Sequence, residues 1–152
     1  MTTLQSIEFD VFAKSLPEAV AALRALGQVS AQDMEKGQLE LVKVRASQIN
    51  VCAYCLQLHL NWARQADVPQ SKLDRVAVWR EAPGFTDGER AALAYTEALS
   101  DPNRRGDVAS ARRALDGVFS QGQLLRLTVA IATINAWNRI ASALEFSPPQ
   151  VE

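Results

Sequence analysis

The sequence predicts an all-α protein, folded as a single domain of six or seven helices. Alanine and leucine, both good helix formers, supply 24 and 17 of the 152 residues. No segment between turn residues alternates apolar and polar side chains, as a half-buried strand would. Helix-capping and helix-ending residues, by contrast, recur along the whole chain. The predicted helices span residues 17–26, 31–47, 52–65, 69–79, 86–99, 107–117 and 121–144.

Proline, glycine and serine mark the first two helices. Pro17 suits the first turn of a helix, and Gly27 lies just past the predicted end of that helix. Ser30 is a start signal for the second helix, in which apolar positions recur at helical spacing.

The remaining helices have start signals of their own. Asn50 is the expected N-cap of the third helix, and Pro69 opens the fourth. A T-x-x-E capping box at 86–89 begins the fifth, and Asp107 caps the sixth. An S-x-x-Q capping box at 120–123 begins the longest helix.

The connections between these helices are short, so one structural domain is expected. Within it, residues 1–29 form an N-terminal helical extension, residues 30–146 the main domain and residues 147–152 a frayed tail. A chain of this length buries roughly 68–70% of its unfolded surface, which is enough for a hydrophobic core.

Charge and hydropathy exclude several classes of protein. The 16 basic residues nearly balance the 17 acidic ones, which gives no general attraction to nucleic acid or anionic membranes. The N-terminus lacks the basic start and apolar run of a signal peptide. No stretch approaches the ~18 apolar residues of a membrane span. We therefore expect a cytoplasmic protein that binds neither nucleic acid nor membrane.

The two cysteines and the single histidine of the chain lie within one short segment. Cys52, Cys55 and His59 follow the pattern C-x-x-C-x-x-x-H, which places all three on one face of a helix. They also lie in its first turns, where unpaired amides and the helix dipole stabilise a thiolate. The pattern indicates a nucleophilic sulfur with a second thiol and a proton carrier beside it.

Peroxide reduction suits this layout. A thiolate attacks the peroxide and becomes a sulfenic acid, and the neighbouring thiol condenses with it to a disulfide. An external dithiol must then reduce that disulfide by exchange.

Three other interpretations compete with a reactive dithiol. Buried cysteines are often inert small hydrophobes. Zinc could be held by Cys52, Cys55, His59 and one carboxylate, although structural zinc sites usually draw ligands from two separated segments. A thioredoxin-type pair should follow a strand in a βαβ pattern, which the sequence lacks.

A wider set of residues resembles the alkyl hydroperoxidase D-like (AhpD-like) proteins of the carboxymuconolactone decarboxylase superfamily. Glu40 stands at the distance before Cys52 at which that family carries a glutamate. Further matching positions are Ala46, Ser47, Asn50, Cys52, Tyr54, Cys55 and His59, with the runs 91–99 and 135–139.

The resemblance implies an all-helical homo-oligomer, whether dimer, trimer or hexamer, with a thiol-dependent peroxidase activity and an antioxidant role. It implies no metal and no other cofactor. By position, Cys55 resembles the attacking cysteine and Cys52 its resolving partner, while Glu40 and His59 resemble the proton relay. The implied partners are a small hydroperoxide and an external dithiol of the dihydrolipoamide or thioredoxin type.

The residues themselves leave the choice of sulfur open. The helix dipole favours a thiolate at Cys52, nearer the N-terminus. Proximity to His59, one turn away, favours Cys55, and we predict attack by Cys55. A non-catalytic oligomeric module with a reversible Cys52–Cys55 disulfide, which senses redox state or passes electrons, is the alternative function.

Neighbouring residues have less specific roles. Tyr54 stands where mycobacterial relatives carry a relay histidine, and with a pKa of ~10 it can only donate a hydrogen bond or pack. Trp62 either walls the pocket or belongs to the core. Spacing alone pairs Glu40 with Lys36 or Lys43 on the surface.

Two amides fall near the apolar stripe of the last helix, Asn135 and Asn138. Buried amides need partners, so we expect both to form hydrogen bonds between helices or subunits.

Overall fold

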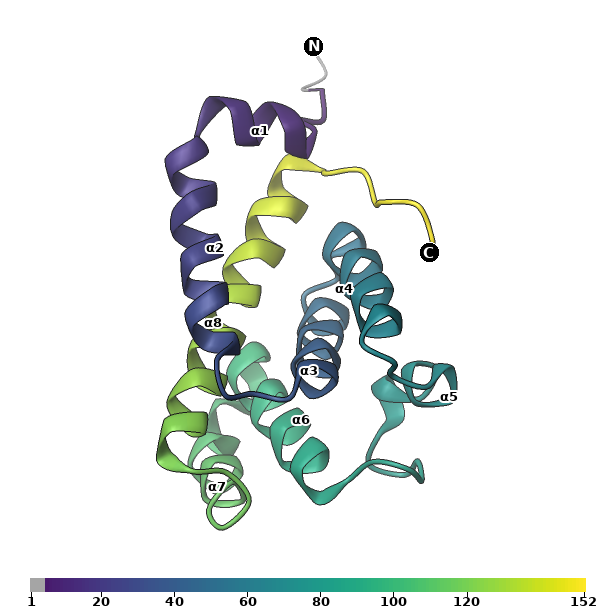
Figure 1. Ribbon diagram of the computed structural model, residues 1–152, viewed down its shortest axis with the longest axis vertical. Coiled ribbons are helices and arrows are strands. Elements are labelled where there is room, and N and C mark those ends of the chain that lie inside the picture. Colours follow the sequence, from purple (N-terminus) through teal and green to yellow (C-terminus); the bar gives the residue numbers. More distant parts are fainter. Residues whose placement is uncertain (1–4) are drawn as a thin grey trace.

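A computed structural model describes residues 5–152, which contain eight α-helices and no strand (Figure 1). The all-α prediction is confirmed. The seven predicted segments correspond to α2 through α8, and α1 is an additional short helix. The helices are α1 Phe9–Ser15, α2 Pro17–Ala31, α3 Lys36–Ile49, α4 Ala53–Gln65, α5 Gln70–Leu73, α6 Asp87–Ser100, α7 Val108–Arg113 and α8 Gln121–Leu144, with 3₁₀ helices η1 Val76–Val78 and η2 Pro102–Asp107.

The longest helix, α8, is the element on which several others pack. α2 lies along one side of it, and α3, α4 and α6 contact its other sides. α3 also packs against α4 and α6, so it lies near the centre of the molecule. Figure 1 shows α1 crossing near the end of α8, where the backbone N–H of Ile7 donates to the carbonyl of Leu144 at 2.9 Å.

Three apolar clusters fill the spaces between the helices. One lies between α3, α6, α7 and α8 and contains Leu127 and Ile131. A second lies between α3, α4 and α6, around Leu41 and Leu93. The third contains both cysteines and Phe146, with side chains from α1, α4 and α8 around them. Both predicted thiols therefore lie in the third of these apolar clusters.

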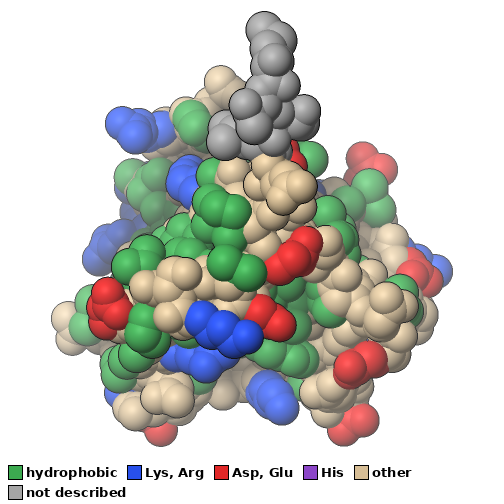
Figure 2. All heavy atoms as spheres, turned by 90° about the horizontal axis from the view of Figure 1, so that it is seen from above, with side chains coloured by type: hydrophobic (Ala, Val, Ile, Leu, Met, Phe, Trp, Pro, Cys, Tyr) green, Lys and Arg blue, Asp and Glu red, His purple; other side chains and the backbone are tan. Residues whose placement is uncertain are grey.

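The outer surface carries charges of both signs. Figure 2, which looks down on the end of the molecule where α1 lies, shows basic and acidic side chains interspersed with hydrophobic ones. No helix in residues 5–152 combines the length and the apolarity needed to cross a membrane.

The boundary between the first two predicted helices was wrong. α2 continues through Gly27 to Ala31, and Ser30 lies inside it with its hydroxyl donating to the carbonyl of Gly27 at 2.9 Å. α3 begins only at Lys36, where the Glu35 side chain accepts hydrogen bonds from the first backbone N–H groups. A glycine costs a helix interior about 1 kcal/mol relative to alanine, which the packing of α2 on α8 outweighs.

The helix predicted at 69–79 is two short pieces, α5 and η1, instead. Val76 and Trp79 are both buried, with 0% and 6% of their surface exposed. Residues three apart lie one above the other in a 3₁₀ turn, so this tighter winding directs both side chains into the core. The indole N–H of Trp79 donates to Glu97 at 3.0 Å, which fixes the position of this segment.

Two further expectations fail at the ends of elements. The predicted helix at 107–117 stops at Arg113, and the Asp107 side chain makes no cap because its backbone already continues from η2. The C-terminal tail is not frayed. Asn61 on α4 donates to the carbonyl of Gln150 at 2.7 Å and accepts from the backbone N–H of Glu152 at 3.2 Å. Both predicted capping boxes, at 86–89 and 120–123, are confirmed.

A pair of leucines on α8 tests this packing. Leu127 is fully buried, whereas Leu125 is 62% exposed. We expect Leu127→Ala to lower the free energy of unfolding by about 2–5 kcal/mol, because it removes core contacts and leaves a cavity. Leu125→Ala, the matched control on the same helix, should change it by less than about 0.5 kcal/mol. Urea denaturation followed by circular dichroism measures both, and equal losses in the two variants would contradict the described packing.

Candidate active site

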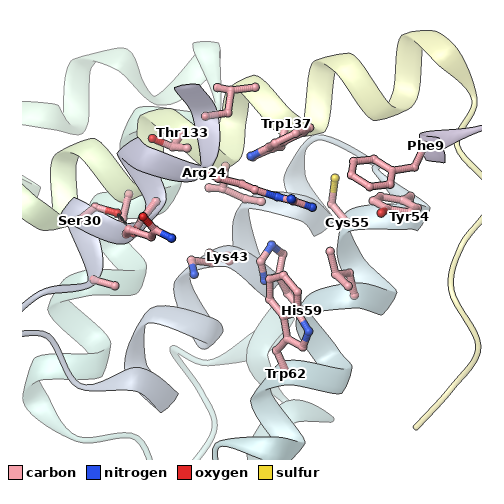
Figure 3. A pocket seen from close by; sticks show the side chains of 17 residues that line it. Phe9, Arg24, Ser30, Lys43, Tyr54, Cys55, His59, Trp62, Thr133 and Trp137 are labelled. Atoms are coloured by element: carbon pink, nitrogen blue, oxygen red, sulfur yellow. Dashed lines mark hydrogen bonds between the residues drawn. The ribbon is translucent and has the colours of Figure 1, made fainter. Parts of the chain in front are cut away.

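A cavity of about 580 Å³ opens between α2, α4 and α8, beside the start of α4 (Figure 3). Its lining is mainly apolar and comes from segments that are far apart in the chain. Four of the residues singled out from the sequence line it, namely Tyr54, Cys55, His59 and Trp62. A partly enclosed apolar space with a few converging polar groups is typical of a small-molecule site.

The two thiols meet at the first turn of α4. Cys52 is the N-cap, and its Sγ accepts a hydrogen bond from the backbone N–H of Cys55 at 3.3 Å. Asn50, which the sequence predicted in this role, ends α3 instead, because Val51 adopts the left-handed region (φ 53°) and turns the chain there. Both cysteines are free thiols and almost fully buried, but only Cys55 lines the cavity.

The pKa values of the two thiols shift in opposite directions. Interaction with the Cys55 side chain lowers the pKa of Cys52 most strongly; burial opposes this, and the Cys55 backbone N–H adds to it, bringing the pKa to about 6. The same interaction, together with burial, raises the pKa of Cys55 above its ordinary value. These opposite shifts favour Cys52 over Cys55 as the thiolate at neutral pH.

A buried carboxylate holds the histidine. Glu40 on α3 is 4% exposed, and its Oε2 lies 2.7 Å from Nδ1 of His59 on α4. Its other oxygen, Oε1, accepts from Nζ of Lys43 at 2.9 Å. The spacing-based pairing of Glu40 with Lys43 is thus confirmed, but the carboxylate lies in the interior and also reaches His59.

Burial and pairing set the charges of this group. Burial opposes the ionisation of Glu40, but His59 and Lys43 outweigh it, so the pKa of Glu40 falls below its usual value. Burial lowers the pKa of His59 and prevails over the attraction of Glu40 for the charged ring. The carboxylate is therefore ionised and the imidazole neutral near pH 7. Nδ1 then carries the proton that Glu40 accepts, and Nε2 is left as a proton acceptor.

Asparagines on α8 fix the turn that presents the cysteines. The Asn50 amide donates to the side-chain oxygens of Asn135 at 2.8 Å and Asn138 at 3.0 Å. Asn138 in turn donates to the Ser47 hydroxyl at 3.0 Å. The predicted hydrogen bonds between helices are confirmed, and they tie the junction of α3 and α4 to α8.

Aromatic side chains form the wall around Cys55. Tyr54 stacks on Phe9 from α1, with ring centroids 6.0 Å apart, and meets Phe146 edge-on at 5.3 Å. Within residues 5–152 the Tyr54 hydroxyl has no hydrogen-bond partner, so of its two expected roles the structure supports packing. Trp62 is 41% exposed and contacts the His59 ring edge-on at 5.1 Å, which makes it a pocket wall rather than a core residue.

Sequence reasoning missed the contributions of α1, α2 and α8 to the cavity. Phe9, Arg24 and Trp137 line it together with the predicted residues. Nothing in the local sequence marks Phe9 or Arg24, because each belongs to an ordinary amphipathic or short helix, whereas Trp137 lies in the run 135–139 that the family resemblance already included. Among residues 5–152, no three His, Cys, Asp or Glu side chains lie close enough to hold a metal ion, and the zinc arrangement considered above is not formed.

Comparisons with known proteins place this geometry in context. A family model described as the carboxymuconolactone decarboxylase family matches residues 16–98, from the start of α2 nearly to the end of α6. The chain is 31% identical over 106 residues to the uncharacterized protein YdfG of Bacillus subtilis, which covers 69% of this chain and 71% of YdfG. It is 34% identical over 105 residues to the uncharacterized protein YnjA of Escherichia coli, covering 69% of this chain and 57% of YnjA.

Solved structures extend the likeness to the whole fold. ATU0492 from Agrobacterium tumefaciens, described as a protein of unknown function and candidate antioxidant defence protein AhpD, is 36% identical with a TM-score of 0.84, covering 91% of this chain and 96% of that one. The debrominase Bmp8 has a TM-score of 0.72 at 18% identity, covering 91% of this chain and 75% of that one. A cysteine-to-alanine variant of Bmp8 with 2,3,4-tribromopyrrole has a TM-score of 0.73. At this identity the likeness to Bmp8 is one of fold.

The lowered pKa of Cys52 predicts that one thiol of the reduced protein ionises at acidic pH. We expect the thiolate absorbance at 240 nm to rise with a midpoint near pH 6, because the lowered pKa of Cys52 keeps its thiolate above that pH and loses it below. A spectroscopic titration of the reduced protein measures this. Cys52→Ser should abolish the low-pH transition, and a wild-type midpoint near the ordinary thiol value of ~8.5 would contradict the described hydrogen bond.

Proposed function

The chain belongs to the carboxymuconolactone decarboxylase family, among its AhpD-like members, and on that premise we propose that it is a thiol-dependent peroxidase that reduces organic hydroperoxides. One observation carries the proposal. Cys52 and Cys55 are buried together at a helix N-terminus, where Cys52 Sγ accepts from the backbone N–H of Cys55 at 3.3 Å, and Cys55 faces an apolar cavity that His59 also lines. The antioxidant description of the similar ATU0492 supports the same activity.

Cys55 is the proposed attacking residue, because of the two thiols it alone lines the cavity. The raised pKa keeps Cys55 protonated until it reacts, so Nε2 of His59 takes the proton only as the sulfur attacks, and Glu40 stabilises the imidazolium that forms. The Cys55 sulfur attacks the terminal peroxide oxygen, the O–O bond breaks, and the alkoxide leaves with the proton from His59. The products are an alcohol and a Cys55 sulfenic acid, and His59 is neutral again.

Cys52 then resolves the sulfenic acid. Its thiolate, held by the low pKa, attacks the Cys55 sulfur, an S–S bond forms, and hydroxide leaves and is protonated by solvent. The two sulfurs therefore have different roles in the proposed cycle. Cys55 lines the cavity and reacts in the first step, and the more acidic Cys52 stays ionised for the second step.

An external dithiol closes the cycle. One of its sulfurs attacks the Cys52–Cys55 disulfide and the other completes the exchange, which restores both thiols. Overall, one hydroperoxide and one dithiol yield an alcohol, water and a disulfide. A dihydrolipoamide- or thioredoxin-like reductant is proposed, with Cys55 as the sulfur that it reaches through the cavity.

The proposed setting is a cytoplasmic homo-oligomer, with the subunit number open between two, three and six. Light scattering during size-exclusion chromatography measures that number. The alternative function, a redox-sensing or electron-passing module, shares the reversible disulfide but requires no peroxide turnover.

Cysteine variants distinguish the two thiols and the two functions. We expect Cys55→Ser to reduce hydroperoxide consumption with dihydrolipoamide to less than about 1% of wild type, because the attacking sulfur is lost. Cys52→Ser should consume about one equivalent of hydroperoxide per chain and then stop as a sulfenic acid that dimedone traps. Parallel assays with thioredoxin and glutathione identify the reductant. A wild-type protein that forms the disulfide but consumes no hydroperoxide with any donor would contradict the proposal and favour the redox module.

A Tyr54 variant tests whether the tyrosine hydroxyl takes the role of the relay histidine that similar mycobacterial proteins carry at this position. We expect Tyr54→Phe to keep kcat/KM within about twofold of wild type, because the ring packs and the hydroxyl carries no proton. His59→Asn, a variant of the proposed base, should lose about 10²-fold or more in the same assay. A comparable loss in Tyr54→Phe would assign the hydroxyl to the relay.

A further inference from the structure

The cavity beside Cys55 is positively charged as well as apolar. Its lining includes two cationic side chains, Arg24 and Lys43, and no aspartate or glutamate among the described residues. The remainder is largely hydrophobic, with Trp62 and Trp137 as its largest surfaces. An apolar cavity that carries cations and lacks acids favours a ligand with an anionic group on a hydrophobic body.

The charge of Lys43 already has a partner. Its Nζ lies 2.9 Å from Oε1 of Glu40, and this ion pair balances the carboxylate that holds His59. Lys43 therefore belongs to the proton-handling group and contributes little free charge to a ligand.

Arg24 is the cation without such a partner. In the view of Figure 3 its side chain points from α2 into the cavity, and its guanidinium carbon lies 5.9 Å from the centre of the Phe9 ring. Burial and Cys55 raise the pKa of Tyr54, and the positive charge of Arg24 partly opposes that rise. Within residues 5–152 the guanidinium makes no side-chain hydrogen bond and no ion pair closer than 4.0 Å. Asp10 on α1 carries a negative charge near Tyr54, and this charge raises the pKa of the Tyr54 hydroxyl.

A guanidinium presents paired N–H donors that match a carboxylate. Arg24 is an exposed residue on the cavity lining, no group among residues 5–152 accepts a hydrogen bond from its side chain, and its guanidinium lies over the Phe9 ring. The volume of about 580 Å³ lies within the range of sites that enclose drug-sized ligands, and it is far larger than hydrogen peroxide needs.

We propose that the cavity binds carboxylate amphiphiles, with the carboxylate on Arg24 and the hydrocarbon body against Trp62 and Trp137. The preferred substrate is then a fatty-acid-type hydroperoxide rather than hydrogen peroxide or a small neutral alkyl hydroperoxide. The substrate assignment rests on the proposed peroxidase function, whereas the binding of the carboxylate does not.

Equilibrium binding tests the site without any turnover. Decanoate and decanol serve as probes, since they share a hydrocarbon chain and differ in charge, and tryptophan fluorescence or calorimetry on the reduced protein reports binding. We expect decanoate to bind at least about tenfold more tightly than decanol, because a charge-assisted hydrogen bond contributes on this scale. Arg24→Gln should remove that preference. Arg75→Gln, which deletes an exposed arginine that does not line the cavity, should retain it.

Kinetics then relate the site to the reaction. Linoleic acid hydroperoxide and its methyl ester are compared below their micellar concentrations, with tert-butyl hydroperoxide as a small neutral substrate. The wild-type ratio of kcat/KM for acid over ester should be about ten or more and should fall toward one in Arg24→Gln but not in Arg75→Gln.

The outcomes separate the two proposals. Equal affinity for decanoate and decanol, or a preference that survives Arg24→Gln, would overturn the carboxylate site. Turnover of ester and tert-butyl hydroperoxide without preference for the acid would overturn the substrate assignment alone. Selective decanoate binding with no turnover of any hydroperoxide would overturn the peroxidase function and leave the carboxylate site standing.

Discussion

The hydrogen bond between Glu40 and His59 is the constraint on which the candidate site depends. Burying a carboxylate in a protein interior is costly unless it is paired and hydrogen-bonded, and here both oxygens have partners, at 2.7 Å to His59 and 2.9 Å to Lys43. Because Glu40 comes from α3 and His59 from α4, the pair also fixes how these helices sit against each other. It sets the tautomer of the imidazole and leaves Nε2 as its proton acceptor.

The thiol pair depends on a second, more local arrangement. Cys52 is the N-cap of α4, and its sulfur accepts a hydrogen bond from a backbone N–H of the first turn. The unpaired amides and the helix dipole at this N-terminus stabilise a thiolate at that position. Backbone hydrogen bonds from Val51 to Gln48 and from Cys52 to Ser47 tie the preceding turn to the end of α3. The amides of Asn135 and Asn138 on α8 tie this turn down and so keep Cys55 toward the cavity.

Much of this could be predicted from the sequence because the relevant patterns are local. The spacing of Cys52, Cys55 and His59 puts them on one helical face, and the capping boxes at 86–89 and 120–123 mark two helix starts correctly. Local patterns failed where packing overrode them. Ser30 has the chemistry of a start signal but lies inside α2, and the tail expected to fray is bound by Asn61.

By itself, then, the sequence determined the helical class and the one segment in which Cys52, Cys55 and His59 share a helical face, because helix periodicity acts over a few positions. Only the tertiary structure decided which sulfur lines the cavity and which thiol has the lowered pKa, since this follows from burial and from the contacts of each thiol. It also decided the character of the cavity. Arg24 and Phe9 line the same cavity as Cys55 because α2 packs along α8 and α1 packs against α2, an arrangement of distant segments that no local pattern encodes.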